Sequence, residues 1–302
     1  MRYRILGKTG LRVSVIGVGT WQFGGEWGKD FTQPEADAIL DAASDCGINF
    51  IDTAECYGPG HLSEKFIGDY LSRRDRSRWI VATKFGHRFK SFMSRDDDYS
   101  IAGVQKQLDD SLRALRVEVI DLYQFHSGVD EFFQDEKLWE FLAGQKRAGK
   151  IRHLGVSILG KGSEMQAREA VKFGVEALQV YYNRLDTKPE QIYFPHAEKN
   201  NLGILARVPL ASGLLSGKYK PGAKFPANDV RSSFGEERLK RELAEVERLQ
   251  REEVPSGVPM AKWAMAWCLR NPIVTALIPG CKNPGQVRVN ASAAGLVDER
   301  IT

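Results

Sequence analysis

The chain has 302 residues, of which 42% are apolar and 27% are charged. Its 43 basic residues are nearly balanced by 39 acidic ones, and no run of Lys and Arg indicates nucleic-acid binding. The first residues lack the apolar region of a secretory signal, and no segment approaches the roughly 18 apolar residues that a membrane helix requires. We therefore expect a cytoplasmic protein that binds neither nucleic acid nor membrane.

The cysteines and histidines are scattered along the chain and form no metal-binding pattern. The 4 cysteines show no CxxC spacing, and the 5 histidines form no HExxH-like pair. The sequence thus predicts neither a disulfide framework nor a metal site.

Short apolar runs alternate with amphipathic segments at helical spacing, which is typical of repeated strand–helix units around a parallel sheet. No linker divides the chain, and no GxGxxG follows the first run, so an open dinucleotide-binding sheet is disfavoured. We predict a single α/β domain over residues 1–302, folded as a (β/α)8 barrel. The expected strands are residues 15–19, 49–52, 79–84, 119–125, 151–156, 177–181, 203–207 and 274–278.

Two segments depart from this eightfold rhythm. Residues 3–17 are expected to form a β-hairpin with its tip at Lys8, Thr9 and Gly10, placed to plug the bottom of the barrel. Residues 208–235 are longer than an ordinary loop of this fold, which is typical of functional loops. After them, 236–252 is predicted to be an extra charged helix that follows the seventh strand.

Polar residues stand at the ends of three successive predicted strands. Asp52 ends the second strand with Tyr57 just after it, Lys84 ends the third, and His126 follows the fourth. The active site of a (β/α)8 barrel lies at the carboxyl ends of its strands. Taken one by one, Asp52 and Lys84 are also explained as a rim ion pair and His126 as a core histidine, but their joint placement favours a catalytic site.

This set can work as a tuned proton donor. A phenol is a poor acid at neutral pH unless a nearby cation stabilises its phenolate, and Lys84 supplies that cation. Asp52 would hold the ammonium charged, and His126 would orient a substrate carbonyl by hydrogen bonding.

The segments that carry these residues, "DTAECYG", "VATKFG" and "DLYQFH", resemble the tetrad segments of the aldo-keto reductase family. The likeness extends over nearly the whole chain, through "GKIRHLGVS", "LQVYYNRLD", "VPLASGLLSGKY" and "LIPGCKNPGQVRVNASAA". Within the family, the chain is similar to the bacterial branch of stress-protein and inositol-utilisation reductases and to potassium-channel β subunits.

The resemblance implies a nicotinamide cofactor across the barrel mouth, NADPH with NADH as the alternative, and hydride transfer to an aldehyde or ketone while Tyr57 protonates its oxygen. Positions that match the family's cofactor contacts are Gly19, Thr20, Trp21, Asp52, Ser157, Gln179, Arg207, Pro209, Leu210, Ser212, Gly213, Leu214, Ser216, Lys218, Arg231, Gly280, Lys282, Gln286 and Asn290.

Several of these positions depart from the family pattern. Ile158 replaces the usual Asn beside Ser157, and Arg207 stands where a tyrosine commonly stacks on the nicotinamide. A guanidinium can also stack on the ring, and its charge should favour NADPH over NADP⁺. Gly280 and Gln286 replace two basic residues, which leaves Lys282 as the nearest partner for a 2′-phosphate.

The substrate is expected to be a small carbonyl compound held by Trp21, Trp27, Tyr57, His87 and His126. The aromatic loops suit an apolar or aryl carbonyl, whereas His87 and Arg88 suit a polar or anionic one. The last expected helix ends close to Thr302, so a C-terminal loop over the pocket is expected to be short.

Two other functions agree with parts of the pattern. A catalytically weak, NADP(H)-binding redox-sensing module, similar to the channel β subunits, would keep the nucleotide site without turnover. A Schiff-base enzyme built on Lys84 would leave Tyr57 and the nucleotide-like segments unexplained. The sequence predicts no oligomeric state.

Overall fold

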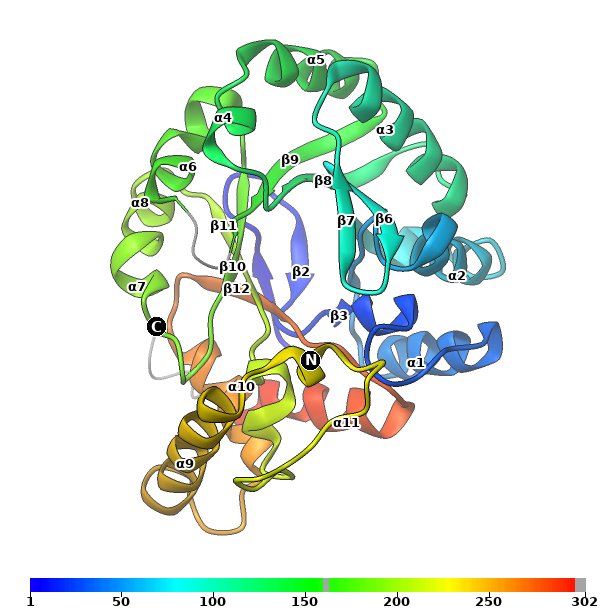
Figure 1. Cartoon of the computed structure of the whole chain (residues 1–302). Coiled ribbons are helices and arrows are strands. Elements are labelled where there is room, and N and C mark those ends of the chain that lie inside the picture. The colour runs from blue at the N-terminus through cyan, green and yellow to red at the C-terminus, as the bar shows by residue number, and fades with distance from the viewer. Residues whose placement is uncertain (160–162, 297–302) are drawn as a thin grey trace.

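Eight parallel strands form the centre of the molecule in a computed structural model that describes residues 1–159 and 163–296 (Figure 1). Each strand is hydrogen-bonded to the next in chain order, and parallel bridges from Ile16 to Leu277 and from Gly19 to Gly280 join the last strand to the first. All eight predicted strands are confirmed, and so is the barrel. The strands are β3 (Val18–Gly19), β4 (Phe50–Asp52), β5 (Ile80–Phe85), β8 (Ile120–His126), β9 (Ile151–Ser157), β10 (Ala177–Tyr181), β11 (Gly203–Arg207) and β12 (Val274–Ile278).

Helices surround the strands and cover their apolar outer faces (Figure 1). The first of them begins at Thr32, whose backbone N–H donates to the Glu35 carboxylate at 2.9 Å in a capping box. The longer helices of this ring are α1 (Gln33–Asp45), α2 (Leu62–Leu71), α3 (Ile101–Leu115), α5 (Glu136–Arg147), α10 (Met260–Arg270) and α11 (Pro284–Ser292). The short ones are α4 (Asp130–Phe133), α6 (Glu164–Glu169), α7 (Pro189–Ile192) and α8 (Phe194–Lys199).

The predicted hairpin closes the bottom of the barrel. Strands β1 (Tyr3–Ile5) and β2 (Arg12–Ser14) pair antiparallel, and β2 lies in the middle of the ring of strands in Figure 1. Leu6 and Val13 are fully buried in the barrel interior, in one cluster with side chains from six of the eight strands. The floor is therefore packed, and the opposite end is left for a ligand.

Two segments shape that open end. The loop after β5 carries a hairpin, β6 (His87–Ser91) and β7 (Ser94–Asp97), which the sequence did not indicate because its residues are mostly charged. The predicted extra helix is present as α9 (Glu236–Glu252), and its buried leucines pack with Trp263 of α10. Within residues 1–159 and 163–296, no helix is both long and apolar enough to cross a membrane.

Candidate active site

A buried ion pair lies where β4 and β5 end at the open mouth of the barrel. Lys84 Nζ donates to Asp52 Oδ1 at 2.6 Å, to the Thr53 carbonyl at 2.7 Å and to the Tyr57 hydroxyl at 3.2 Å. Parallel strands place residues at their carboxyl ends next to one another, which is why residues 32 positions apart meet here. The structure thus brings together the acid, the base and the phenol that the sequence predicted.

Asp52 is 2% exposed and is held by several donors besides Lys84. The Gln124 and Gln179 amides donate to its second oxygen, Oδ2, at 3.1 and 2.8 Å. Ser157 in turn donates to Gln179 Oε1 at 3.4 Å. Hydrogen bonds from both amides hold the Asp52 carboxylate in place, so this network fixes the position of the Lys84 ammonium. Gln124 was not predicted.

The local environment sets the protonation states of these groups. Burial raises the pKa of Tyr57 and outweighs the opposing effect of Lys84, so the phenol is protonated at neutral pH. Burial acts against the charge on Lys84, but Asp52 and Tyr57 more than offset it, and the pKa of the ammonium lies above its usual value. The resting site therefore holds a neutral phenol beside a firmly charged ammonium.

His126, at the end of β8, stands beside this group. Its ring centroid lies 6.0 Å from that of Tyr57 in an edge-on contact. Its Nδ1 lies 3.7 Å from the Cys56 sulfur, and the Tyr99 hydroxyl donates to its backbone carbonyl at 2.6 Å. Burial, then Lys84, holds the pKa of His126 well below its usual value, so the imidazole is neutral.

A cavity of about 950 Å³ opens above the tetrad, and nearly every predicted site residue lines it. Lys84 lies beneath the Tyr57 hydroxyl and does not line it. Leu214 does not line it either, because its side chain is fully buried in the core made with α9 and α10. The predicted residues that line the cavity are Gly19, Thr20, Trp21, Trp27, Asp52, Tyr57, His87, His126, Ser157, Gln179, Arg207, Pro209, Leu210, Ser212, Gly213, Ser216, Lys218, Arg231, Gly280, Lys282, Gln286 and Asn290.

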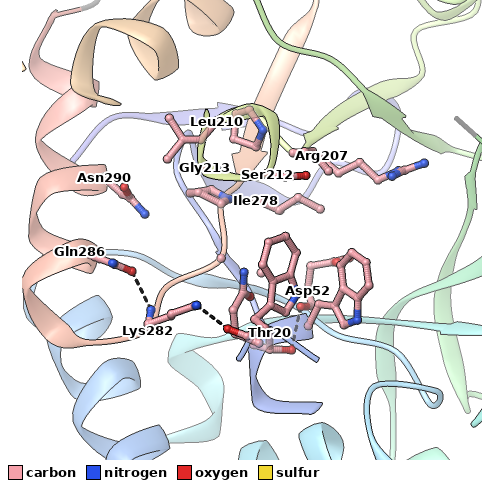
Figure 2. Close-up of a pocket in the computed structure, with 18 of the residues that line it drawn as sticks. Thr20, Asp52, Arg207, Leu210, Ser212, Gly213, Ile278, Lys282, Gln286 and Asn290 are labelled. Carbon is pink, nitrogen blue, oxygen red and sulfur yellow. Dashed lines mark hydrogen bonds between the residues drawn. The ribbon is translucent and has the colours of Figure 1, made fainter. Parts of the chain in front are cut away.

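Lys282, Gln286 and Asn290 lie on one side of this cavity, and Asp52 and Arg207 lie on the other (Figure 2). The Gln286 amide oxygen accepts from the Lys282 backbone N–H at 2.8 Å, which closes the turn before α11. The Lys282 ammonium donates to the Trp27 carbonyl at 2.5 Å. The predicted adenosine and nicotinamide ends are thus on separate sides of one continuous pocket.

Arg231, one of the predicted cofactor contacts, forms two side-chain hydrogen bonds with Asp229 at 2.8 and 2.6 Å. A further nitrogen donates to the Tyr219 hydroxyl at 2.9 Å. Arg231 thus lines the cavity while its charge is paired with the Asp229 carboxylate.

The cavity fits a polar ligand with ring systems. Three buried polar atoms among the side chains that line it have no hydrogen-bond partner: Gln22 Oε1, Trp27 Nε1 and Arg207 Nε. Buried polar groups are nearly always paired, so these three atoms, among the residues that the structure describes, are exceptions in the cavity wall. The turn from Ala211 to Ser216 has left-handed residues at Ser212 and Gly213, which brings backbone close to the cavity.

Sequence reasoning missed several residues at the mouth. Arg95 of β7 forms a buried ion pair with Glu26 at 2.5 Å, and Met93 N–H donates to the same carboxylate at 2.7 Å. Trp21 Nε1 also donates to Glu26 at 2.7 Å. The contacts of Met93 and Arg95 with Glu26 join residues 67 and 69 positions apart in the chain, so no local sequence pattern predicts them. Cys56 lines the cavity too, and its place next to Tyr57 was the one available signal.

Comparisons with known proteins agree with this geometry. The sequence profile described as "Aldo/keto reductase family" matches residues 15–302. The chain is 34% identical over 306 residues to the Bacillus subtilis oxidoreductase YrpG, covering 95% of this chain and 89% of that protein. It is 30% identical to the NADH-specific methylglyoxal reductase of Escherichia coli, covering 96% of this chain and 93% of that protein.

A solved structure shows the same likeness. The holo form of aldo-keto reductase AKR11C1 from Bacillus halodurans superimposes with a TM-score of 0.81 at 28% identity, covering 100% of this chain and 95% of that one. These findings agree with one another: the family profile matches residues 15–302, the barrel has the same architecture, and the relatives are of similar length. The chain therefore belongs to the aldo/keto reductase family and is an NAD(P)H-dependent oxidoreductase.

Proposed function

We propose that the protein is an NADPH-dependent carbonyl reductase that uses Tyr57 as its general acid. The observation that carries this proposal is the Lys84 ammonium, which contacts the Asp52 carboxylate at 2.6 Å and the Tyr57 hydroxyl at 3.2 Å. The bound nicotinamide supplies a hydride, and the chain must supply the matching proton. The Tyr57 hydroxyl is the protonated group that both lines the cavity and touches a fixed cation.

In the reaction, Tyr57 protonates the carbonyl oxygen as the carbon is reduced, and its phenolate is left beside Lys84. The ammonium stabilises that phenolate because the two lie in a buried site of low dielectric constant. Asp52 keeps the ammonium charged and in place. His126 is neutral, so it offers one N–H as a hydrogen bond to the carbonyl oxygen and does not compete as an acid.

The cofactor side of the cavity favours a phosphate-bearing dinucleotide. Lys282, Gln286 and Asn290 would hold the adenosine and its 2′-phosphate, and Ser157 and Gln179 the carboxamide. Arg207 lines the nicotinamide side and would lie against the ring. Because the Escherichia coli relative is named as NADH-specific, the preference for NADPH needs its own titration.

The geometry disfavours the Schiff-base alternative. An amine attacks a carbonyl only when it is unprotonated. Lys84 is fully buried, paired with Asp52, and has a pKa raised above its usual value, so it stays an ammonium.

The proposal is tested by titrating NADPH and NADH against protein fluorescence and following reduction of 4-nitrobenzaldehyde at 340 nm. Tyr57→Phe should retain NADPH binding and lose nearly all turnover. Tyr3→Phe is the matched control, because the Tyr3 hydroxyl donates to the Gly47 carbonyl at the barrel floor. NADPH binding without turnover on any carbonyl would support the redox-sensing module instead, and equal turnover in Tyr57→Phe would refute the assigned acid.

A further inference from the structure

Cys56 stands at the junction between the catalytic histidine and the β6–β7 hairpin. Cys56 is 2% exposed and lines the cavity. Its sulfur lies 3.7 Å from His126 Nδ1. The positive charge of Arg95, which is itself anchored by Glu26, acts on the same thiol and lowers its pKa against the larger effect of burial. Glu26, Arg95, Cys56 and His126 thus form a row from a buried carboxylate to the imidazole at the cavity.

Donor and acceptor rules favour one arrangement of the hydrogens along this row. Arg95 has N–H donors and no acceptor, so the Cys56 sulfur can meet it only as an acceptor. The thiol then has its single hydrogen left for its other neighbour, His126 Nδ1. Burial raises the pKa of the thiol to about 11, so that hydrogen is present at neutral pH.

The consequence falls on the opposite nitrogen of the ring. His126 is neutral and therefore carries one N–H. If Nδ1 accepts from the thiol, the hydrogen must be on Nε2. An Nε2–H can donate to a carbonyl oxygen, whereas the other tautomer would present a lone pair and repel it.

We propose that Cys56 is a positioning residue that, held by Arg95 and Glu26, fixes His126 as the Nε2–H tautomer and so aims a hydrogen-bond donor at the substrate carbonyl. The catalytic effect of this tautomer rests on the proposed carbonyl reduction, whereas the tautomer itself is inferred from the geometry. It also gives the β6–β7 hairpin a part in catalysis, because Arg95 is on β7.

The test compares Cys56→Ala, which removes the donor, with Cys56→Ser, which restores one. Cys268→Ala is the matched control, because Cys268 is a fully buried thiol that does not line the cavity. Long-range proton–nitrogen NMR of ¹⁵N-histidine protein reports the tautomer, with the His126 signals identified by their loss in His126→Gln. Thermal unfolding shows that each variant is folded.

The wild type and Cys56→Ser should show the Nε2–H tautomer with Nδ1 shifted as a hydrogen-bond acceptor, and in Cys56→Ala the Nδ1 shift should move to that of an unbonded nitrogen. Turnover of 4-nitrobenzaldehyde should fall about two- to tenfold in kcat/KM in Cys56→Ala, with NADPH affinity unchanged. An Nδ1–H tautomer in the wild type, or identical Nδ1 shifts in wild type and Cys56→Ala, would overturn the proposal. If the wild type reduces no carbonyl, the proposed function fails while the NMR result still decides the tautomer.

Discussion

Glu55 gives the sharpest stability prediction, because it is a buried carboxyl group with one poorly placed partner. It is 7% exposed, its Oε1 lies 3.8 Å from His61 Nε2, and its Oε2 has no hydrogen-bond partner. The His61 ring is already shared with Glu64 at 2.6 Å and with Asp110 at 3.8 Å. Three carboxyl groups thus surround one imidazole, with Arg88 as a more distant cation.

Burial, followed by the neighbouring acids, raises the pKa of Glu55 to about 8 from a reference of 4.5. A group whose folded pKa is raised stabilises the fold below its unfolded pKa, and that contribution is lost as pH rises toward the folded value. At about 1.4 kcal/mol for each pKa unit, Glu55 lowers the free energy of unfolding by up to about 5 kcal/mol as the pH rises from 4.5 to 8. The pKa of His61 is also raised, so its contribution falls in the same direction.

Glu55→Gln keeps the shape and removes the ionisation. We expect the free energy of unfolding in urea to match the wild type within about 1 kcal/mol at pH 5, and to exceed it by about 3 kcal/mol at pH 7 and by more at pH 9. Glu118→Gln, at an exposed glutamate, controls for the loss of a charge. Parallel pH profiles for Glu55→Gln and wild type would show that Glu55 is ionised without cost and that the reasoning is wrong.

Three further predictions concern the cavity walls. Arg207→Leu should reduce the preference for NADPH over NADP⁺ by about fivefold, measured as the ratio of their dissociation constants. If the wild type binds NADPH and NADP⁺ with nearly equal dissociation constants, Arg207 does not favour the reduced cofactor. Lys282→Ala should weaken NADPH about tenfold and leave NADH within about twofold, and equal losses for both would place the lysine elsewhere. Gly19→Ala should destabilise the fold by about 2 kcal/mol in urea, because a Cβ would come 2.5 Å from the Ile278 carbonyl. Gly280→Ala should cost less, since the atoms nearest to its Cβ belong to the movable end of the Gln22 side chain.

The barrel and the tetrad could be predicted because both depend on local patterns. Strand runs are apolar on both faces in a parallel sheet, so β4, β5 and β8 stand out as continuous stretches. Once a barrel is assumed, Asp52, Lys84 and His126 must share one mouth, since each stands at the end of its strand. No contact between distant residues had to be known.

The rest depends on contacts that are remote in sequence. The β6–β7 hairpin has a charged sequence and owes its place to the Arg95–Glu26 pair. Arg231 was expected to contact the cofactor, and in the structure Asp229, two residues away, takes two of its side-chain hydrogen bonds. A carboxylate so near in the chain could have been weighed as a partner, whereas the sulfur beside His126 could not, because 70 residues separate them.

Glu55 and Cys56 together explain how the loop after β4 holds Tyr57. Both side chains are nearly fully buried, and they contact different partners. Glu55 lies beside His61, and Cys56 lies beside His126. A loop anchored by consecutive side chains has little freedom left at the next residue. The Tyr57 backbone N–H donates to the Ala54 carbonyl at 3.1 Å, which closes the same turn. The position of the phenol is thus set by packing around its own loop, and Lys84 meets a hydroxyl that is already in place.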